Sequence, residues 1–118
     1  MHIDLNLEVL TKSELVRLTH LFEALTESKR SKAFNGFLCW AARETEREMR
    51  GRRLRVPLRH AVNLELHRMR PGEVLFLQRQ LQQWETEFGE HAMGQAADAF
   101  WQARAGLWAG SSATLLLN

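Results

Sequence analysis

The histidines are the side chains of this sequence most suited to metal chemistry. His60 and His67 lie seven residues apart, on one face if their segment is helical, and His20 lies one helical turn before Glu23. Imidazole and carboxylate groups bind metal ions when three or four of them converge on one point. Because the spacing supplies no third ligand to either pair, we predict no metal site.

Nucleophilic catalysis and nucleotide binding have no sequence support either. Cys39 lies in the apolar run Phe37–Trp40, where a thiol usually packs as a small hydrophobic side chain and is poorly reactive. The seven glycines form neither a GxGxxG nor a P-loop pattern, so no glycine-rich loop cradles a phosphate. We therefore expect no enzymatic activity, no cofactor and no small-molecule substrate.

The densest charge in the chain is basic. Residues 50–70 hold seven arginines against Glu65 alone, although the 118-residue chain has a formal net charge of only +2. Phosphate contact is a natural use of such a stretch, and the candidate nucleic-acid-binding residues are Arg50, Arg52, Arg53, Arg55 and Arg59. Alternatively, these arginines pair inside the molecule with residues 71–118, which carry a net charge of −3, or with the Glu-rich end of the second helix.

A second candidate surface consists of Trp101, Arg104 and Trp108. Phe100 and Trp101 are adjacent on a predicted helix, so they cannot both face one core, and Trp108 lies two turns after Trp101 on the same side. Trp and Arg are enriched among the residues that dominate interface energies. We interpret the three residues as a partner-binding face, with burial against the helix bundle as the alternative.

The first half of the chain predicts one strand and two helices. Alternating apolar and polar residues indicate a strand over 3–9. Thr11 and Glu14 form a capping-box signature before a helix over about 12–27. A second helix follows after a short polar connection, and Gly51 is its expected end.

The second helix becomes highly charged in its later part, over residues 43–50. Glu46 and Arg50 lie four residues apart there, a spacing that favours an ion pair on a solvent-facing helix. We therefore expect this part of the helix to project into solvent.

Residues 52–70 fit two interpretations. Their alternating pattern is typical of strands, but Pro57 suits the first turn of a helix, and apolar residues after it fall on one helical face. We predict a short strand at 52–56, which could pair with the N-terminal strand, and a helix at 57–69.

The last part of the chain is predicted to be helical up to an apolar tail. A regular apolar stripe follows Pro71–Gly72 and ends at Gly89, and another helix is expected over about 91–108. The tail over 111–118 is rich in leucine, so we expect it to dock as an edge strand or to bind another chain.

The order of a strand and two helices over residues 3–50 resembles a ribbon-helix-helix DNA-binding module. In that family the outward face of paired strands enters the major groove of DNA. The corresponding face here consists of Asp4, Asn6 and Glu8, and its carboxylates would be repelled by phosphate. The resemblance therefore implies no functional residue.

These patterns predict a mainly helical α+β protein, a single domain over 1–118 with four to five helices, a short N-terminal strand and one or two further short strands. A lone cysteine, no membrane-spanning run and no signal-like N-terminus favour a cytoplasmic location. We expect a small, non-catalytic binding protein, an adaptor, assembly subunit or inhibitor of the kind common among phage and mobile-element products. Its partner would be another protein or a second copy, with nucleic acid as the alternative.

Overall fold

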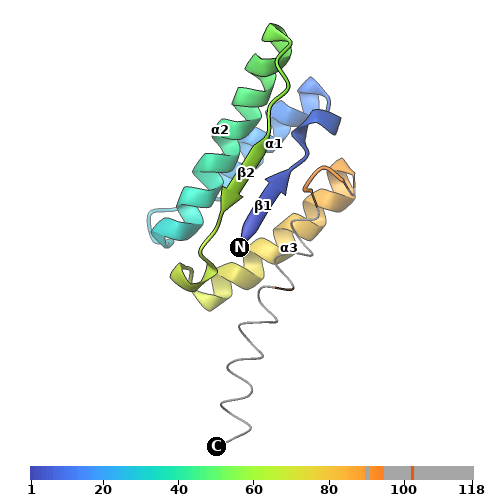
Figure 1. Cartoon of the computed structure of the whole chain (residues 1–118). Coiled ribbons are helices and arrows are strands. Elements are labelled where there is room, and N and C mark those ends of the chain that lie inside the picture. Colours follow the sequence, from blue (N-terminus) through green and yellow to red (C-terminus); the bar gives the residue numbers. More distant parts are fainter. Residues whose placement is uncertain (90, 95–101, 103–118) are drawn as a thin grey trace, which may run out of the picture.

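The computed structural model describes residues 1–89, 91–94 and 102 (Figure 1). They form, in chain order, strand β1 (His2–Leu5), the 3-10 turn η1 (Leu7–Val9), helices α1 (Lys12–Ala24) and α2 (Lys32–Leu54), strand β2 (His60–Asn63), the 3-10 turn η2 (Leu66–Arg68) and helix α3 (Pro71–Phe88).

The mainly helical class with a small amount of strand is confirmed, but the described residues contain three α-helices, fewer than the four to five predicted for the chain. The expected helix over 91–108 and the apolar tail over 111–118 lie almost entirely outside the described residues, of which 91–94 form a turn. No helix in the described part of the chain is both long enough and apolar enough to cross a membrane.

The predicted starts of the first two helices are confirmed by their caps. The Glu14 backbone N–H donates to Oγ1 of Thr11 at 3.1 Å, and the Thr11 N–H donates to Oε1 of Glu14 at 2.9 Å, which completes a capping box. Ser31 caps α2 by accepting the Phe34 N–H at 3.1 Å. These contacts satisfy N–H groups that have no partner inside the helix.

The prediction that α2 ends at Gly51 and that a strand follows over 52–56 is wrong. The helix continues to Leu54, and Arg55 then adopts a left-handed conformation with φ 56°. The Arg55 N–H donates to the Arg52 carbonyl at 3.2 Å and the Val56 N–H to the Gly51 carbonyl at 2.8 Å, which is a Schellman motif. Gly51 therefore lies inside the helix. A Cβ at this position would come within 2.6 Å of the Leu58 side chain, so glycine leaves room for Leu58 to pack there.

The predicted helix over 57–69 is also wrong, because the segment contains β2 and η2. β2 runs antiparallel to β1, with Ile3 opposite Val62 and Leu5 opposite His60. A single strand leaves its backbone polar groups without partners, so pairing with β1 outweighs the helical spacing of the apolar residues. Pairing within one chain also distinguishes the fold from the ribbon-helix-helix arrangement, in which the strand serves a DNA-binding ribbon.

One hydrophobic core joins the strands to all three helices. The Phe22 ring of α1 meets Trp84 of α3 edge to face, with ring centroids 5.0 Å apart. Fully buried members of the core come from β1 and from the three helices: Ile3, Leu15, Leu18, Phe22, Phe34, Leu38, Leu77 and Leu81. Figure 1 shows the C-terminal end of α2 and the loop after it extending beyond the strands, away from the Pro71 end of α3.

The turn over residues 91–94 closes against β1. The Asn6 N–H donates to the Ala92 carbonyl at 3.0 Å. Gly94 has a φ of +54°, and a Cβ on it would overlap the backbone carbonyl oxygen of Asp4. Only glycine therefore fits both the conformation and the space at this position.

Candidate functional site

The two pairs considered as metal ligands differ in their exposure. His60 is buried while His67 is exposed on η2, and His20 and Glu23 are exposed on α1. Within the described residues no group of three histidine, cysteine or carboxylate side chains could hold a metal ion. Cys39 is exposed on α2, so the expectation that it packs as a small apolar side chain is wrong.

His60 instead lies between two buried glutamates. Its Nδ1 is 3.3 Å from Oε1 of Glu44, and its Nε2 is 3.1 Å from Oε1 of Glu48. The two glutamates are one helical turn apart on α2 and therefore face β2 together. An imidazolium has two N–H donors and can satisfy both carboxylates, whereas a neutral imidazole has one.

Two arginines of α2 extend this cluster at its edges. Arg47 donates to Oε1 of Glu44 at 2.5 Å, and Nε of Arg52 lies 3.4 Å from Oε2 of Glu48. The Arg52 guanidinium also donates to the Leu10 carbonyl oxygen at 2.6 Å and to further carbonyls of η1. Alternating charges therefore hold α2 against β2 and against the turn that precedes α1.

The later arginines of the basic stretch also have partners within the fold. Nη2 of Arg59 lies 3.0 Å from Oδ2 of Asp4, and Nε of Arg68 lies 2.6 Å from Oε2 of Glu65. Arg70 donates to a backbone carbonyl of the loop between α1 and α2 at 2.7 Å. These contacts lie inside the molecule, but neither carboxylate belongs to residues 71–118 or to the Glu-rich part of the second helix.

The arginines at the end of α2 behave differently. Arg50, Arg53 and Arg55 are exposed, and none forms an ion pair or a side-chain hydrogen bond with the residues that the structure describes. The predicted ion pair between Glu46 and Arg50 does not form. This end of α2 therefore carries a group of cations whose charge nothing described in the fold neutralises.

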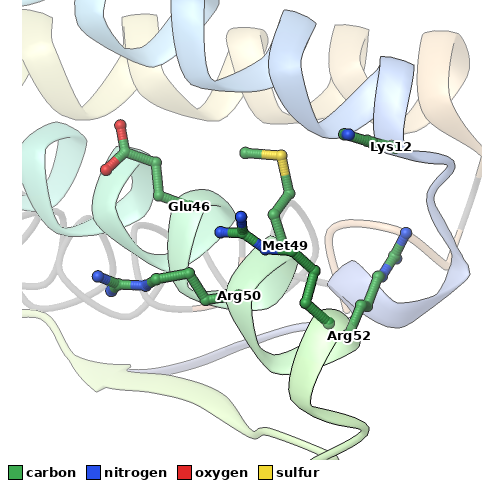
Figure 2. Close-up of a pocket in the computed structure, with 6 residues that line it drawn as sticks. Lys12, Glu46, Met49, Arg50 and Arg52 are labelled. Carbon is green, nitrogen blue, oxygen red and sulfur yellow. The ribbon is translucent and has the colours of Figure 1, made fainter.

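A groove of about 520 Å³ lies between these cations and the start of α1 (Figure 2). We call it the basic groove, and its lining residues are Lys12, Glu46, Met49, Arg50, Arg52 and Arg53. Lys12 lies on α1, across from the residues of α2. Four of the six side chains are cationic, one is anionic and one is apolar, so the groove favours an anionic ligand that also carries apolar surface.

Four large apolar side chains are exposed in the described part of the chain. Leu54 is 74% exposed, Val9 56%, Val56 49% and Val16 40%. We call Leu54 and Val56, which flank Arg55 at the end of α2, the apolar rim. Exposed apolar side chains bordered by charged residues are one mark of a binding site.

The candidate residues predicted from the sequence lie in different places. Arg50, Arg52 and Arg53 come together at the basic groove, Arg55 lies beside it at the end of α2, and Arg59 is paired with Asp4 on the sheet. Trp101, Arg104 and Trp108 lie outside the described residues, so the face that they would form stays a prediction.

No sequence pattern indicated that Lys12 and Met49 line a groove or that the apolar rim is exposed. Lys12 is 37 residues before Met49, and nothing in their spacing indicates that α1 begins beside the end of α2. Comparison with protein-family models, with curated proteins and with solved structures gives no match.

Proposed function

We propose that this protein is a small, non-catalytic binding protein that docks an acidic partner protein in the basic groove, as an adaptor, assembly subunit or inhibitor. The observation that supports the proposal is the division of the arginines. Those on the sheet and beyond it, such as Arg59 and Arg68, have carboxylate partners within the fold, whereas Arg50, Arg53 and Arg55 have none among the described residues.

The local energetics favour a partner at this position. Like charges gathered at one helix end repel each other, and an acidic partner relieves that repulsion. The positive charges do complement the helix C-terminus, but that contribution is small, about 0.3–1 kcal/mol per charge at an exposed position. Arg55 also holds a left-handed backbone that disfavours any residue with a Cβ, by roughly 1–2 kcal/mol. Backbone strain of this kind is concentrated at functional sites.

A protein partner fits the groove better than a nucleic acid does. Nucleic-acid sites are dominated by phosphate contacts, with aromatic side chains where single strands bind. The groove is lined by Met49, and its surroundings expose aliphatic side chains that phosphate contacts would leave in water. Arginine next to desolvated apolar groups is typical of protein interfaces.

The proposal is tested by affinity capture from the native host with quantitative mass spectrometry. The groove variant is Arg50→Glu/Arg53→Glu, and the matched control is Lys29→Glu/Arg79→Glu, which makes the same change in net charge at exposed residues outside the groove. We expect one acidic protein to be captured by the wild type and by the control and to be lost from the groove variant.

Direct binding then separates the two partner classes. The captured protein is purified and titrated against the three forms by fluorescence anisotropy, in parallel with duplex DNA and single-stranded RNA. Tight binding of the captured protein, weakened as salt rises and lost in the groove variant, supports the proposal. Binding of DNA or RNA that depends on Arg50 and Arg53, without such a protein, would assign the groove to nucleic acid instead.

A further inference from the structure

Resting on the proposed function, we infer that the partner segment which enters the basic groove is an amphipathic acidic peptide, with carboxylates for Arg50 and Arg53 and an apolar side chain that packs on Leu54 and Val56. The groove supplies the charges and the apolar rim supplies the contact surface. A purely anionic ligand would use the first and leave the second in water.

The helix ending does not cover the Val56 side chain of the apolar rim. In a Schellman motif the residue after the left-handed position usually packs against the side chain five or six residues earlier, at the last helical turn. Here the left-handed residue is Arg55, so the packing residue is Val56, and the earlier positions are Gly51, which has no side chain, and Arg50. Val56 consequently stays 49% exposed.

Leu54 is exposed for a related reason. It ends α2 on the outside of the helix, 74% exposed, between two arginines that have no ion-pair partner among the described residues. The chain turns back after Arg55, and Leu58 packs over Gly51. The fold therefore partly buries Leu58 while Leu54 remains available to another molecule.

The spacing of the groove cations defines where the carboxylates of the bound peptide would lie. Arg50 and Arg53 are three residues apart on α2, a spacing that places them on one helix face. Lys12 lies across the groove from Arg50 (Figure 2). Met49 lines the same groove. A bound peptide that alternates acidic and apolar residues would place its apolar groups on Met49 and the rim, with acidic groups on either side.

The test is selection from a random peptide library displayed on phage, panned against the full-length chain. Three forms are compared: the wild type, Arg50→Glu/Arg53→Glu, and Leu54→Ser/Val56→Ser. A fourth, Val16→Ser, controls for the loss of an exposed apolar side chain that lies outside the apolar rim. Circular dichroism establishes that each variant is folded.

We expect the wild type and Val16→Ser to enrich peptides that combine Asp or Glu with Leu, Ile or Phe. One enriched peptide, synthesised and labelled, should bind the Leu54→Ser/Val56→Ser form about tenfold more weakly than the wild type, and should not bind the Arg50→Glu/Arg53→Glu form measurably.

Two other outcomes overturn the inference in distinguishable ways. If the enriched peptides are acidic without apolar residues, or bind the Leu54→Ser/Val56→Ser form as tightly as the wild type, the apolar rim has no part in recognition and the proposed function still stands. If Arg50→Glu/Arg53→Glu enriches and binds the same peptides as the wild type, or if no peptide is enriched, the groove is not the docking site and both proposals are wrong.

Discussion

Nε2 of His60 lies 3.1 Å from Oε1 of Glu48, at a point where β2 crosses the buried face of α2. Glu48 in turn holds Arg52, whose guanidinium also binds carbonyl oxygens of η1. Arg52 is thereby fixed as a wall of the basic groove, while Arg50 and Arg53 on the same helix stay without ion-pair partners among the described residues. The buried glutamate thus joins His60 of β2 to Arg52 at the groove.

Replacing His60 by leucine should destabilise the protein. It removes a buried hydrogen-bonding partner from Glu44 and Glu48, which keep only their contacts with Arg47 and Arg52, and the loss of such a partner costs about 1–3 kcal/mol. The triple variant Glu44→Leu/Glu48→Leu/His60→Leu removes the two buried carboxylates together with the imidazole and should recover part of the loss. Urea denaturation measures both. A single variant as stable as the wild type would show that the cluster carries little energy.

Glu73 should make the stability depend on acid pH. Burial by itself raises the pKa of Glu73, but the backbone N–H groups of Arg70 and Ser31, together with the Arg70 charge, lower it further than burial raises it. The carboxylate therefore contributes stability above the ordinary glutamate pKa, and that contribution is lost as pH falls through the lowered pKa of the folded state.

Glu73→Gln should accordingly lower the free energy of unfolding at neutral pH by about 1–3 kcal/mol. The difference from the wild type should shrink as the pH falls toward the acid range. Glu65→Gln, which alters an exposed ion pair with Arg68, should follow the wild-type pH curve. Denaturant titrations at a series of pH values decide, and a Glu73→Gln difference that is constant with pH would refute the assignment.

Arg55→Gly should stabilise the protein. Glycine adopts the left-handed backbone of this position without the Cβ clash, and the gain after its larger chain entropy is about 0.5–1 kcal/mol. Arg53→Gly, two residues earlier and inside the helix, should instead lower stability by a similar amount. Thermal unfolding of the two variants side by side tests this. Equal or lower stability of Arg55→Gly would mean that its side chain contributes to the fold.

Gly94→Ala should be among the most destabilising single-methyl changes in the chain. The added Cβ would overlap the Asp4 carbonyl oxygen, and the backbone φ of +54° disfavours alanine as well. The turn would have to move away from β1 and lose the bond from the Asn6 N–H to Ala92, at a cost of about 2–4 kcal/mol. Gly36→Ala, where the site is open, is the control and should be neutral or slightly stabilising.

Local signals predicted the parts of the fold that local contacts determine. The capping box of Thr11 and Glu14 marked the start of α1, and the apolar stripe after Pro71 marked α3. The prediction for the segment after Gly51 was wrong because the secondary structure of that segment depends on distant residues. The glycine fits inside α2 since Leu58 returns over it, and residues 60–63 form a strand because β1 needs a partner.

The candidate site was predictable only in its charge. The sequence shows a basic centre, and some of its carboxylate partners are local, as in the pairs of Arg52 with Glu48 and of Arg68 with Glu65. The partner of Arg59, by contrast, is Asp4, 55 residues earlier in the chain. No periodicity encodes so distant a contact. The same holds for Lys12, which reaches the groove because α1 begins beside the end of α2.

Site-specific photo-crosslinking in the native host shows which molecule the basic groove contacts. In one variant a benzophenone amino acid replaces Glu46, which lines the groove without adding to its positive charge, and in the control variant it replaces Arg79 on α3. We predict that position 46 crosslinks to one acidic protein and that position 79 does not. If position 46 crosslinks to nucleic acid, or if the acidic protein crosslinks only to position 79, the basic groove does not dock an acidic partner protein.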